Sequence, residues 1–217
     1  PLNGRNFEYL TEDPYLNGRL AAAIVKGIQS EGVGVSIKHY AVNNQETNRM
    51  SINEVVSERA LREIYLSAFE YVVKNSDPWT VMSSYPKING THGAQNKYLL
   101  TDILKNEWKF NGLVMSDWFA VKDAVAAVNA GNDLIMPGGP KWGGQGDTSD
   151  DVLAGLENGT IKEADIDKNI KNILKIVLKS LSFKGDLPTN KPDLKANVEI
   201  VRKTAAEGMV LLKNEKK

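Results

Sequence analysis

Short apolar runs rich in β-branched residues alternate with amphipathic stretches along this chain, and this alternation constrains the fold more than any other feature of the sequence. The apolar runs lie at residues 33–38, 80–84, 112–116 and 133–136. Nearly continuous apolar strands are typical of parallel sheets that are covered on both faces. Parallel strands need a crossover connection, usually a helix, so the pattern predicts an α/β fold in which parallel strands alternate with helices.

Helical periodicity predicts what lies between and beyond these strands. Ser51 and Glu54 form an S-x-x-E capping-box pattern, which predicts that a helix begins there. Further helices are expected at about residues 96–108, 121–130, 150–157, 163–181 and 194–208.

Polar residues at the strand ends distinguish two architectures, a doubly wound open sheet and a (β/α)8 barrel. Lys38 and His39, then Tyr85, then Asp117 stand where successive strands end. In a barrel these ends converge on one mouth, where barrel active sites lie. No strand is followed by G-x-G-x-x-G, the nucleotide-binding fingerprint of the open sheet. A barrel typically needs about 250 residues. Only four strand–helix units are visible, so we expect a partial (β/α)8 TIM-like barrel.

The barrel portion is expected to end near residue 183. The stretch at 183–192 contains Gly185 and Pro192 and is typical of a linker. We therefore expect two parts, residues 1–183 as the portion of the barrel and residues 184–217 as a linker and helix leading towards a further domain.

Composition excludes several classes of function. The 27 basic and 27 acidic residues balance, whereas nucleic-acid binding needs clustered positive charge. The absence of cysteine excludes disulfides and zinc–thiolate sites. No metal-ligand cluster is visible, and we expect no cofactor. The longest apolar stretches are shorter than the roughly 20 residues that span a bilayer, and the compartment, cytoplasmic or secreted, stays open.

Asp117 is the sharpest catalytic candidate. It follows the strand at 112–116 and is followed by Trp118. A carboxylate beside an aromatic ring at a barrel mouth suits a sugar, which offers an apolar C–H face for stacking and hydroxyls for hydrogen bonding. The alternative is that Asp117 only caps the helix that follows, as aspartate often does after a strand.

Cationic donors form a second constellation. A lysine ending a buried strand is costly without a partner, so Lys38 and His39 are candidates for binding sugar hydroxyls close to Asp117. They could instead be a surface lysine and a loop histidine. Arg5 and Arg49 carry forked donors suited to vicinal hydroxyls, against the alternative of ordinary surface ion pairs.

The motifs that carry these residues resemble glycoside hydrolase family 3. I-L-K-N-E at 103–107, followed after four residues by G-L-V-M-S-D at 112–117, is similar to the nucleophile signature of that family. Its other blocks are matched, in the same order, at residues 1–14, 38–49, 57–70 and 82–89. The resemblance covers essentially the whole chain.

The resemblance implies a role for each candidate residue. Asp117 would be the nucleophile, Tyr85 would hydrogen-bond to it, and Trp118 would pack at the boundary with the leaving group. Met82 would line the pocket. The residues implied to hold the hydroxyls of the non-reducing glucose in the −1 subsite are Arg5, Lys38, His39 and Arg49.

The resemblance also bears on substrate and mechanism. K-H-Y-A-V-N-N at residues 38–44 is similar to the β-glucosidases of the family, while its N-acetylhexosaminidases and xylosidases remain alternatives. It implies a retaining exo-β-glycosidase that removes terminal non-reducing β-D-glucosyl residues from β-glucosides or oligosaccharides by double displacement. Retaining glycosidases form a covalent glycosyl-enzyme, and a second carboxyl about 5–5.5 Å away serves as acid and then as base.

The acid/base of the family's β-glucosidases is usually a glutamate in an αβα sandwich domain, and a further sugar-binding aspartate precedes the block that contains Arg5. We therefore expect the remaining barrel segment and the sandwich domain on another chain or a longer precursor, and little hydrolytic activity from this chain alone. Two alternatives stay open: a non-catalytic carbohydrate-binding subunit or inactive fragment, and a barrel enzyme acting on phosphorylated small molecules.

Overall fold

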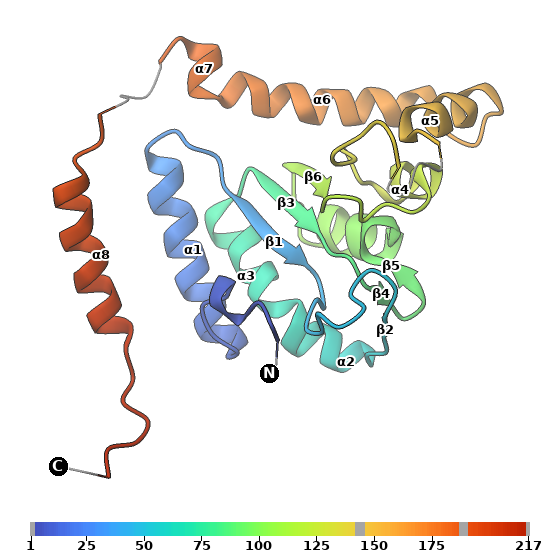
Figure 1. Ribbon diagram of the computed structural model, residues 1–217. Coiled ribbons are helices and arrows are strands. Elements are labelled where there is room, and N and C mark those ends of the chain that lie inside the picture. Colours follow the sequence, from blue (N-terminus) through green and yellow to red (C-terminus); the bar gives the residue numbers. More distant parts are fainter. Residues whose placement is uncertain (1–2, 142–145, 187–190, 216–217) are drawn as a thin grey trace. The chain divides into compact units, whose positions relative to one another are not determined.

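The computed structural model describes residues 3–141, 146–186 and 191–215. The chain divides into two compact units, Pro1–Lys184 and Gly185–Lys217. Figure 1 shows the first unit as strands and helices in alternation and the second as a helix with extended flanks.

The elements follow one another as predicted for an α/β chain. The first half contains η1 (Asn6–Glu8), α1 (Pro14–Ser30), β1 (Ser36–Tyr40), β2 (Asn53–Glu54), α2 (Glu58–Ala60), η2 (Leu61–Tyr65), α3 (Ser67–Ser76), β3 (Thr80–Ser83), β4 (Lys87–Ile88), β5 (Thr91–His92) and η3 (Gly93–Gln95). The second half contains η4 (Tyr98–Glu107), β6 (Leu113–Ser116), α4 (Ala124–Ala130), α5 (Thr148–Glu157), α6 (Glu163–Lys179), α7 (Leu181–Lys184) and α8 (Leu194–Gly208).

The main sheet has the order β1-β3-β6, and both of its pairings are parallel. Leu134 adds a parallel bridge to Met115, within the run at 133–136 that was predicted as a strand. The main strands therefore lie side by side in the same order as in the sequence, and helices connect them. The predicted α/β class is confirmed. The carboxyl ends of all these strands consequently meet at one edge of the sheet.

The two faces of the sheet differ. Val81 and Val114 pair in register and are fully buried. They belong to the same hydrophobic cluster as the apolar side chains of η4. Burying such a side chain stabilises a fold by roughly 1.5–3 kcal/mol. Because side chains alternate along a strand, the next pair in register, Met82 and Met115, lies on the opposite face, where both are only half-buried.

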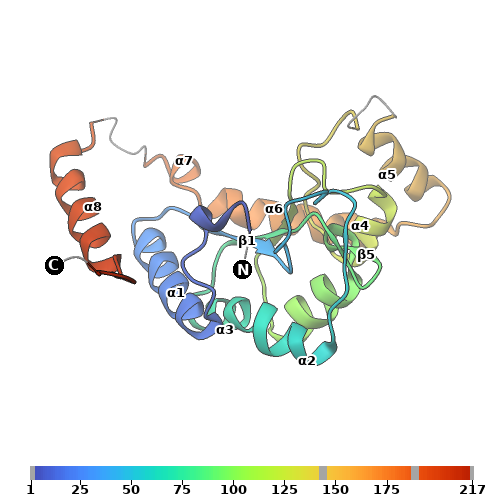
Figure 2. The same ribbon diagram turned by 60° about the horizontal axis from the view of Figure 1, so that its bottom comes forward.

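Helices α1 and α3 pack together along one side of the strands, as the two views in Figures 1 and 2 show. Helix α1 was not among the predicted helices. Asp13 caps it, because Asp13 Oδ1 accepts the backbone N–H of Tyr15 at 2.9 Å, and Pro14 occupies its first turn.

The predicted capping box was wrong. Ser51 and Glu54 do not open a helix; Glu54 lies in β2, which pairs in parallel with β4. The helical stretch begins instead after Ser57, whose Oγ accepts the backbone N–H of Ala60. Strand β1 also lies three residues later at its start than the predicted run at 33–38, so Lys38 and His39 belong to the strand itself.

The second unit contains α8, at the residues where a helix was predicted. Asp193 Oδ1 caps it by accepting the backbone N–H of Ala196 at 3.0 Å. Of the linker predicted at 183–192, residues 187–190 lie outside the described residues. Within the described part of the chain, no helix combines the length and the apolar character needed to cross a membrane.

A buried ion pair ties three elements of the first unit together. Lys105 Nζ of η4 lies 2.7 Å from Asp133 Oδ1, with side chains only 8% and 0% exposed. Asp133 Oδ2 accepts the N–H of Val114 in β6 at 2.8 Å, and Asn172 of α6 donates to Asp133 Oδ1 at 3.1 Å. Burial lowers the pKa of Lys105, and Asp133 opposes that effect.

We predict that Lys105→Met lowers the free energy of unfolding by about 3 kcal/mol, because it leaves the Asp133 carboxylate buried without its cation. Urea unfolding measures this change. The control is Lys74→Met, which removes one partner of the exposed pair with Glu70 and should cost less than about 1 kcal/mol. Equal losses in the two variants would contradict this account of Asp133.

Candidate active site

Asp117 lies directly after β6, with a side chain that is only 12% exposed. Its backbone N–H donates to Ser83 O at 3.3 Å, which holds it at the carboxyl ends of β3 and β6 together. Its Oδ1 accepts the backbone N–H of Trp118 at 2.7 Å. Asp117 does not cap the following helix, because that role belongs to Asp123, whose side chain accepts the N–H of Ala126.

His39 faces Asp117 from β1. Its Nε2 lies 3.5 Å from Asp117 Oδ2, and its side chain is 1% exposed. Its Nδ1 lies 2.8 Å from the hydroxyl of Tyr9. Burial, reinforced by the nearby Arg5 and Lys38 cations, lowers the pKa of His39 to about 4, against the opposing effect of Asp117. The imidazole is therefore neutral at physiological pH.

Tyr85 approaches Asp117 from the loop after β3. Burial, together with the nearby Asp117 carboxylate, raises the pKa of Tyr85 to about 12. The guanidinium of Arg49 stacks over the Tyr85 ring, 4.6 Å from its centroid. Arg49 Nη1 also donates to Glu46 Oε2 at 2.9 Å. The tyrosine therefore stays protonated at neutral pH and serves as a hydrogen-bond donor.

Arg5 and Lys38 share one carboxylate, Glu8. Arg5 donates to it through Nε and Nη2, both at 2.8 Å, and Lys38 Nζ donates at 3.0 Å. The hydrogen bond from Arg5 is the main reason that the pKa of Glu8 falls to about 2. Glu8 is thus the ion-pair partner of Lys38, whose side chain is 43% exposed, and the trio keeps one net positive charge.

Met82 and Trp118 supply apolar surface. Met82 lies on the half-exposed face of β3 described above. Trp118 is 54% exposed, which is unusual for so large an aromatic residue. It makes an edge-to-face contact with Phe119, with ring centroids 6.2 Å apart. An exposed aromatic face next to a buried carboxylate is suited to stacking against a sugar ring.

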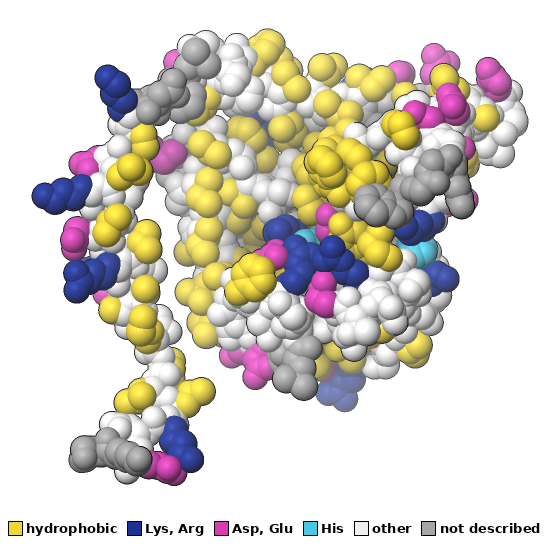
Figure 3. Space-filling view, viewed as in Figure 1, with side chains coloured by type: hydrophobic (Ala, Val, Ile, Leu, Met, Phe, Trp, Pro, Cys, Tyr) yellow, Lys and Arg dark blue, Asp and Glu magenta, His cyan; other side chains and the backbone are white. Residues whose placement is uncertain are grey.

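The structure thus brings most of the predicted site residues into one network. His39 lies against Asp117, Arg49 stacks on Tyr85, and the Asp117 carboxylate raises the pKa of Tyr85. Arg5 and Lys38 act on His39 electrostatically. Figure 3 shows basic, acidic and histidine side chains gathered in the middle of one face, beside apolar groups. Tyr9, which was not among the predicted site residues, also belongs to this network.

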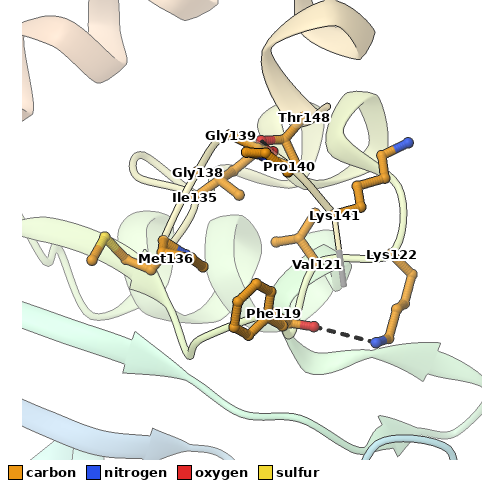
Figure 4. Close-up of a pocket in the computed structure, with 11 residues that line it drawn as sticks. Phe119, Val121, Lys122, Ile135, Met136, Gly138, Gly139, Pro140, Lys141 and Thr148 are labelled. Atoms are coloured by element: carbon orange, nitrogen blue, oxygen red, sulfur yellow. Dashed lines mark hydrogen bonds between the residues drawn. The ribbon is translucent and has the colours of Figure 1, made fainter. Parts of the chain in front are cut away.

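A small hollow of about 110 Å³ lies between the loops that follow β6 and the Leu134 bridge. In Figure 4 the side chains of Phe119, Val121 and Ile135 converge on it. Two lysines lie on its rim: Lys122 Nζ donates to Phe119 O at 3.2 Å, and Lys141 Nζ pairs with Asp151 at 2.5 Å. Phe119, which lines this hollow, directly follows Trp118 in the sequence.

A larger groove, of about 1150 Å³, lies beside β1. Glu8, Tyr9 and Lys38 line its polar part, while Ile24 of α1 and Phe69 of α3 belong to its apolar part. In the described part of the chain, β1 pairs with β3 on one side and has no strand on its other side. Among all residues that the structure describes, no group of three or more histidine, aspartate or glutamate side chains is placed to bind a metal ion.

Comparison with known proteins gives this fold a family. The model of the glycosyl hydrolase family 3 N terminal domain matches residues 1–176. The chain belongs to glycosyl hydrolase family 3. The predicted resemblance is confirmed.

Relatives and solved structures in family 3 agree with this assignment. The thermostable β-glucosidase B of Acetivibrio thermocellus is 46% identical over 99% of this chain and 28% of its own length. The exo-α-(1→6)-L-arabinopyranosidase of Bifidobacterium longum is also 46% identical, over 99% of this chain and 27% of its own. The structure of β-glucosidase 3B from Thermotoga neapolitana in complex with glucose matches all of this chain and 30% of that one, with a TM-score of 0.94 and 50% identity.

Two facts follow from these matches. The predicted TIM-like barrel architecture is confirmed, because a family 3 β-glucosidase of 50% identity superposes on the whole chain. The chain spans 27–28% of the length of the two curated relatives named above.

The lowered pKa of His39 predicts how stability depends on pH. The folded-state pKa of about 4 lies below the ordinary value of 6.5, so between these values the unfolded chain binds the proton and the folded chain does not. Stability therefore falls as the pH drops from 6.5 towards 4. Between pH 7 and pH 4.5 the wild type should lose about 2 kcal/mol more than His39→Gln. Urea unfolding at both pH values measures this, and identical losses would contradict it.

Proposed function

We propose that this protein is a retaining exo-β-glycosidase that hydrolyses terminal non-reducing β-D-glucosyl residues, with Asp117 as the nucleophile. The observation that carries the proposal is the placement of one buried carboxylate, Asp117, against His39 and Tyr85 at the strand ends. Membership in glycosyl hydrolase family 3 and the β-glucosidase names of relatives support glycoside chemistry over the alternative of phosphorylated substrates.

The contacts of Asp117 support a nucleophile. The N–H of Trp118 fixes Oδ1, so the carboxylate is oriented before substrate binds, and the protonated Tyr85 beside it is proposed to donate to the same carboxylate. In the first displacement a carboxylate oxygen of Asp117 forms a bond to the anomeric carbon as the bond to the leaving-group oxygen breaks. In the second, water attacks the same carbon and releases Asp117, which restores the original configuration.

The −1 subsite is proposed to consist of donors and apolar surface around this carboxylate. Met82 and the exposed ring of Trp118 would contact the apolar faces of the pyranose and of the leaving group. The sugar hydroxyls would be bound by the guanidinium groups of Arg5 and Arg49, the ammonium group of Lys38 and the neutral imidazole of His39.

The general acid/base is proposed to lie outside these 217 residues. The other two carboxylates of the network are already engaged, Glu8 with Arg5 and Lys38, and Glu46 with Arg49. We propose that residues 1–183 form the C-terminal portion of the barrel, with the rest of the barrel along the groove beside β1. Residues 184–217 would then lead towards an αβα sandwich domain that carries the acid/base.

A second substrate class is a pentopyranoside. A relative named exo-α-(1→6)-L-arabinopyranosidase is 46% identical to this chain, the same figure as for the thermostable β-glucosidase B. A pentopyranoside lacks the hydroxymethyl group of glucose. The donor-rich −1 subsite favours glucose, because each absent hydroxyl leaves a desolvated donor without a partner.

Trapping with an activated 2-fluoro-glucoside tests the nucleophile. A fluorine at C2 slows both displacements, and a good leaving group restores the first without an acid, so the glycosyl-enzyme accumulates. We predict that peptide mapping of the labelled protein, in its natural assembly, places the adduct on Asp117. Asp117→Asn should abolish labelling and lower kcat by at least about a thousandfold, since an amide is a poor nucleophile.

The matched control is Asp123→Asn, six residues further along the same loop. Asparagine caps helices about as well as aspartate, so this variant should label and turn over like the wild type. An adduct on another residue would overturn the assignment of the nucleophile. The absence of any adduct would favour a non-catalytic carbohydrate-binding subunit.

Substrate preference is tested with two nitrophenyl glycosides. We predict that kcat/KM for the β-D-glucopyranoside exceeds that for the α-L-arabinopyranoside by at least about tenfold, the cost of one lost polar contact. The reverse order would favour an arabinopyranosidase. Both assays use the protein in its natural assembly.

A further inference from the structure

Tyr9 stands outside the set of residues that the sequence marked, yet it touches the active site. It follows Glu8 at the end of η1, and its hydroxyl lies 2.8 Å from His39 Nδ1. The two rings are tilted by 59°, with centroids 6.2 Å apart, so the contact between them is made by the hydroxyl rather than by stacking.

The position of Asp117 decides which nitrogen of His39 carries the proton. His39 Nε2 faces Asp117 Oδ2 at 3.5 Å, and a carboxylate oxygen accepts hydrogen bonds. The neutral imidazole has one N–H and one acceptor nitrogen. The proton therefore belongs on Nε2, and Nδ1 is the acceptor that faces Tyr9.

We propose that Tyr9 is a positioning residue, which donates to His39 Nδ1 and thereby fixes the imidazole as the Nε2–H tautomer with that N–H directed at Asp117. Without this donor, Nδ1 would be a buried acceptor without a partner, and the tautomer with Nδ1–H would become accessible. The same logic operates in metal sites, where a second group on the far nitrogen of a histidine fixes its tautomer and orientation.

The consequence for sugar binding rests on the function proposed above. An Nε2–H presented at the nucleophile is a donor for a sugar hydroxyl, whereas an unprotonated Nε2 would be a second acceptor facing a carboxylate. The charged groups around His39 are Arg5, Lys38, Glu8 and Asp117. Tyr9 carries no charge; its proposed effect is to fix which ring nitrogen of His39 carries the proton.

Long-range ¹H–¹⁵N spectra of the imidazoles test the proposal, because protonated and unprotonated ring nitrogens have distinct shifts. The chain has only two histidines, so His92→Gln assigns both. His92 is an internal reference of the opposite kind: its Nδ1 lies 3.1 Å from Tyr85 O, a carbonyl that can only accept, which requires Nδ1–H. We expect Nε2–H for His39 and Nδ1–H for His92.

Tyr9→Phe removes only the hydroxyl. We expect the Nδ1–H tautomer of His39 to appear in this variant and its titration to move to higher pH. With β-glucoside substrate, kcat/KM should fall by about three- to tenfold, the range for one hydrogen bond. The control is Tyr15→Phe, whose hydroxyl binds Arg19 and not His39; it should change neither the spectra nor the kinetics.

Nδ1–H for His39 in the wild type would overturn the proposal, and so would a Tyr9→Phe protein with the wild-type tautomer and titration. If Tyr9→Phe does not fold, the wild-type spectrum still decides between the two tautomers. If the wild type hydrolyses no glycoside, the proposed function fails, while the imidazole spectra judge the role of Tyr9 independently.

Discussion

Parallel pairing of β1, β3 and β6 in chain order is the constraint on which the rest of the structure depends. It brings three carboxyl ends to one edge, so residues far apart in the sequence become neighbours. The backbone hydrogen bond from Asp117 to Ser83 O extends this register beyond the strands. His39 then lies against the carboxylate of Asp117, and Tyr85 is near enough for that carboxylate to raise its pKa. The buried pair of Lys105 and Asp133 connects β6 of the same sheet to η4 and α6.

The site balances charge locally rather than by bringing opposite charges to the nucleophile. Glu8 neutralises one of the two cations Arg5 and Lys38, which leaves a positive charge beside His39. Burial, reinforced by that charge, lowers the pKa of His39 and keeps its imidazole neutral. Tyr85 stays protonated beside Asp117, because burial and that carboxylate raise the pKa of Tyr85 to about 12. Such an arrangement presents fixed donors around one carboxylate, which suits a polyhydroxylated ligand and a nucleophile that must keep its lone pairs available.

Much of this arrangement could be predicted from the sequence, because strand and helix periodicity is local. The position of Asp117 at the end of a strand was predicted because it directly follows an apolar run. The pairing of β2 with β4 could not be predicted, since two-residue strands carry no periodicity. The helix predicted from the capping pattern at Ser51 and Glu54 was wrong because the pairing of β2 with β4 prevailed over a local preference. The contact of Tyr9 with His39 joins residues 30 positions apart, and only the folded chain brings them together.

A crystal structure of the 2-fluoro-glucosyl intermediate, solved on the protein in its natural assembly, tests the central claim most directly. The account predicts continuous density from Asp117 to the anomeric carbon, with the sugar hydroxyls within hydrogen-bond distance of His39 Nε2 and of the Arg5, Lys38 and Arg49 donors. Density on a different carboxylate, or a sugar bound away from His39 and Tyr85, would contradict it.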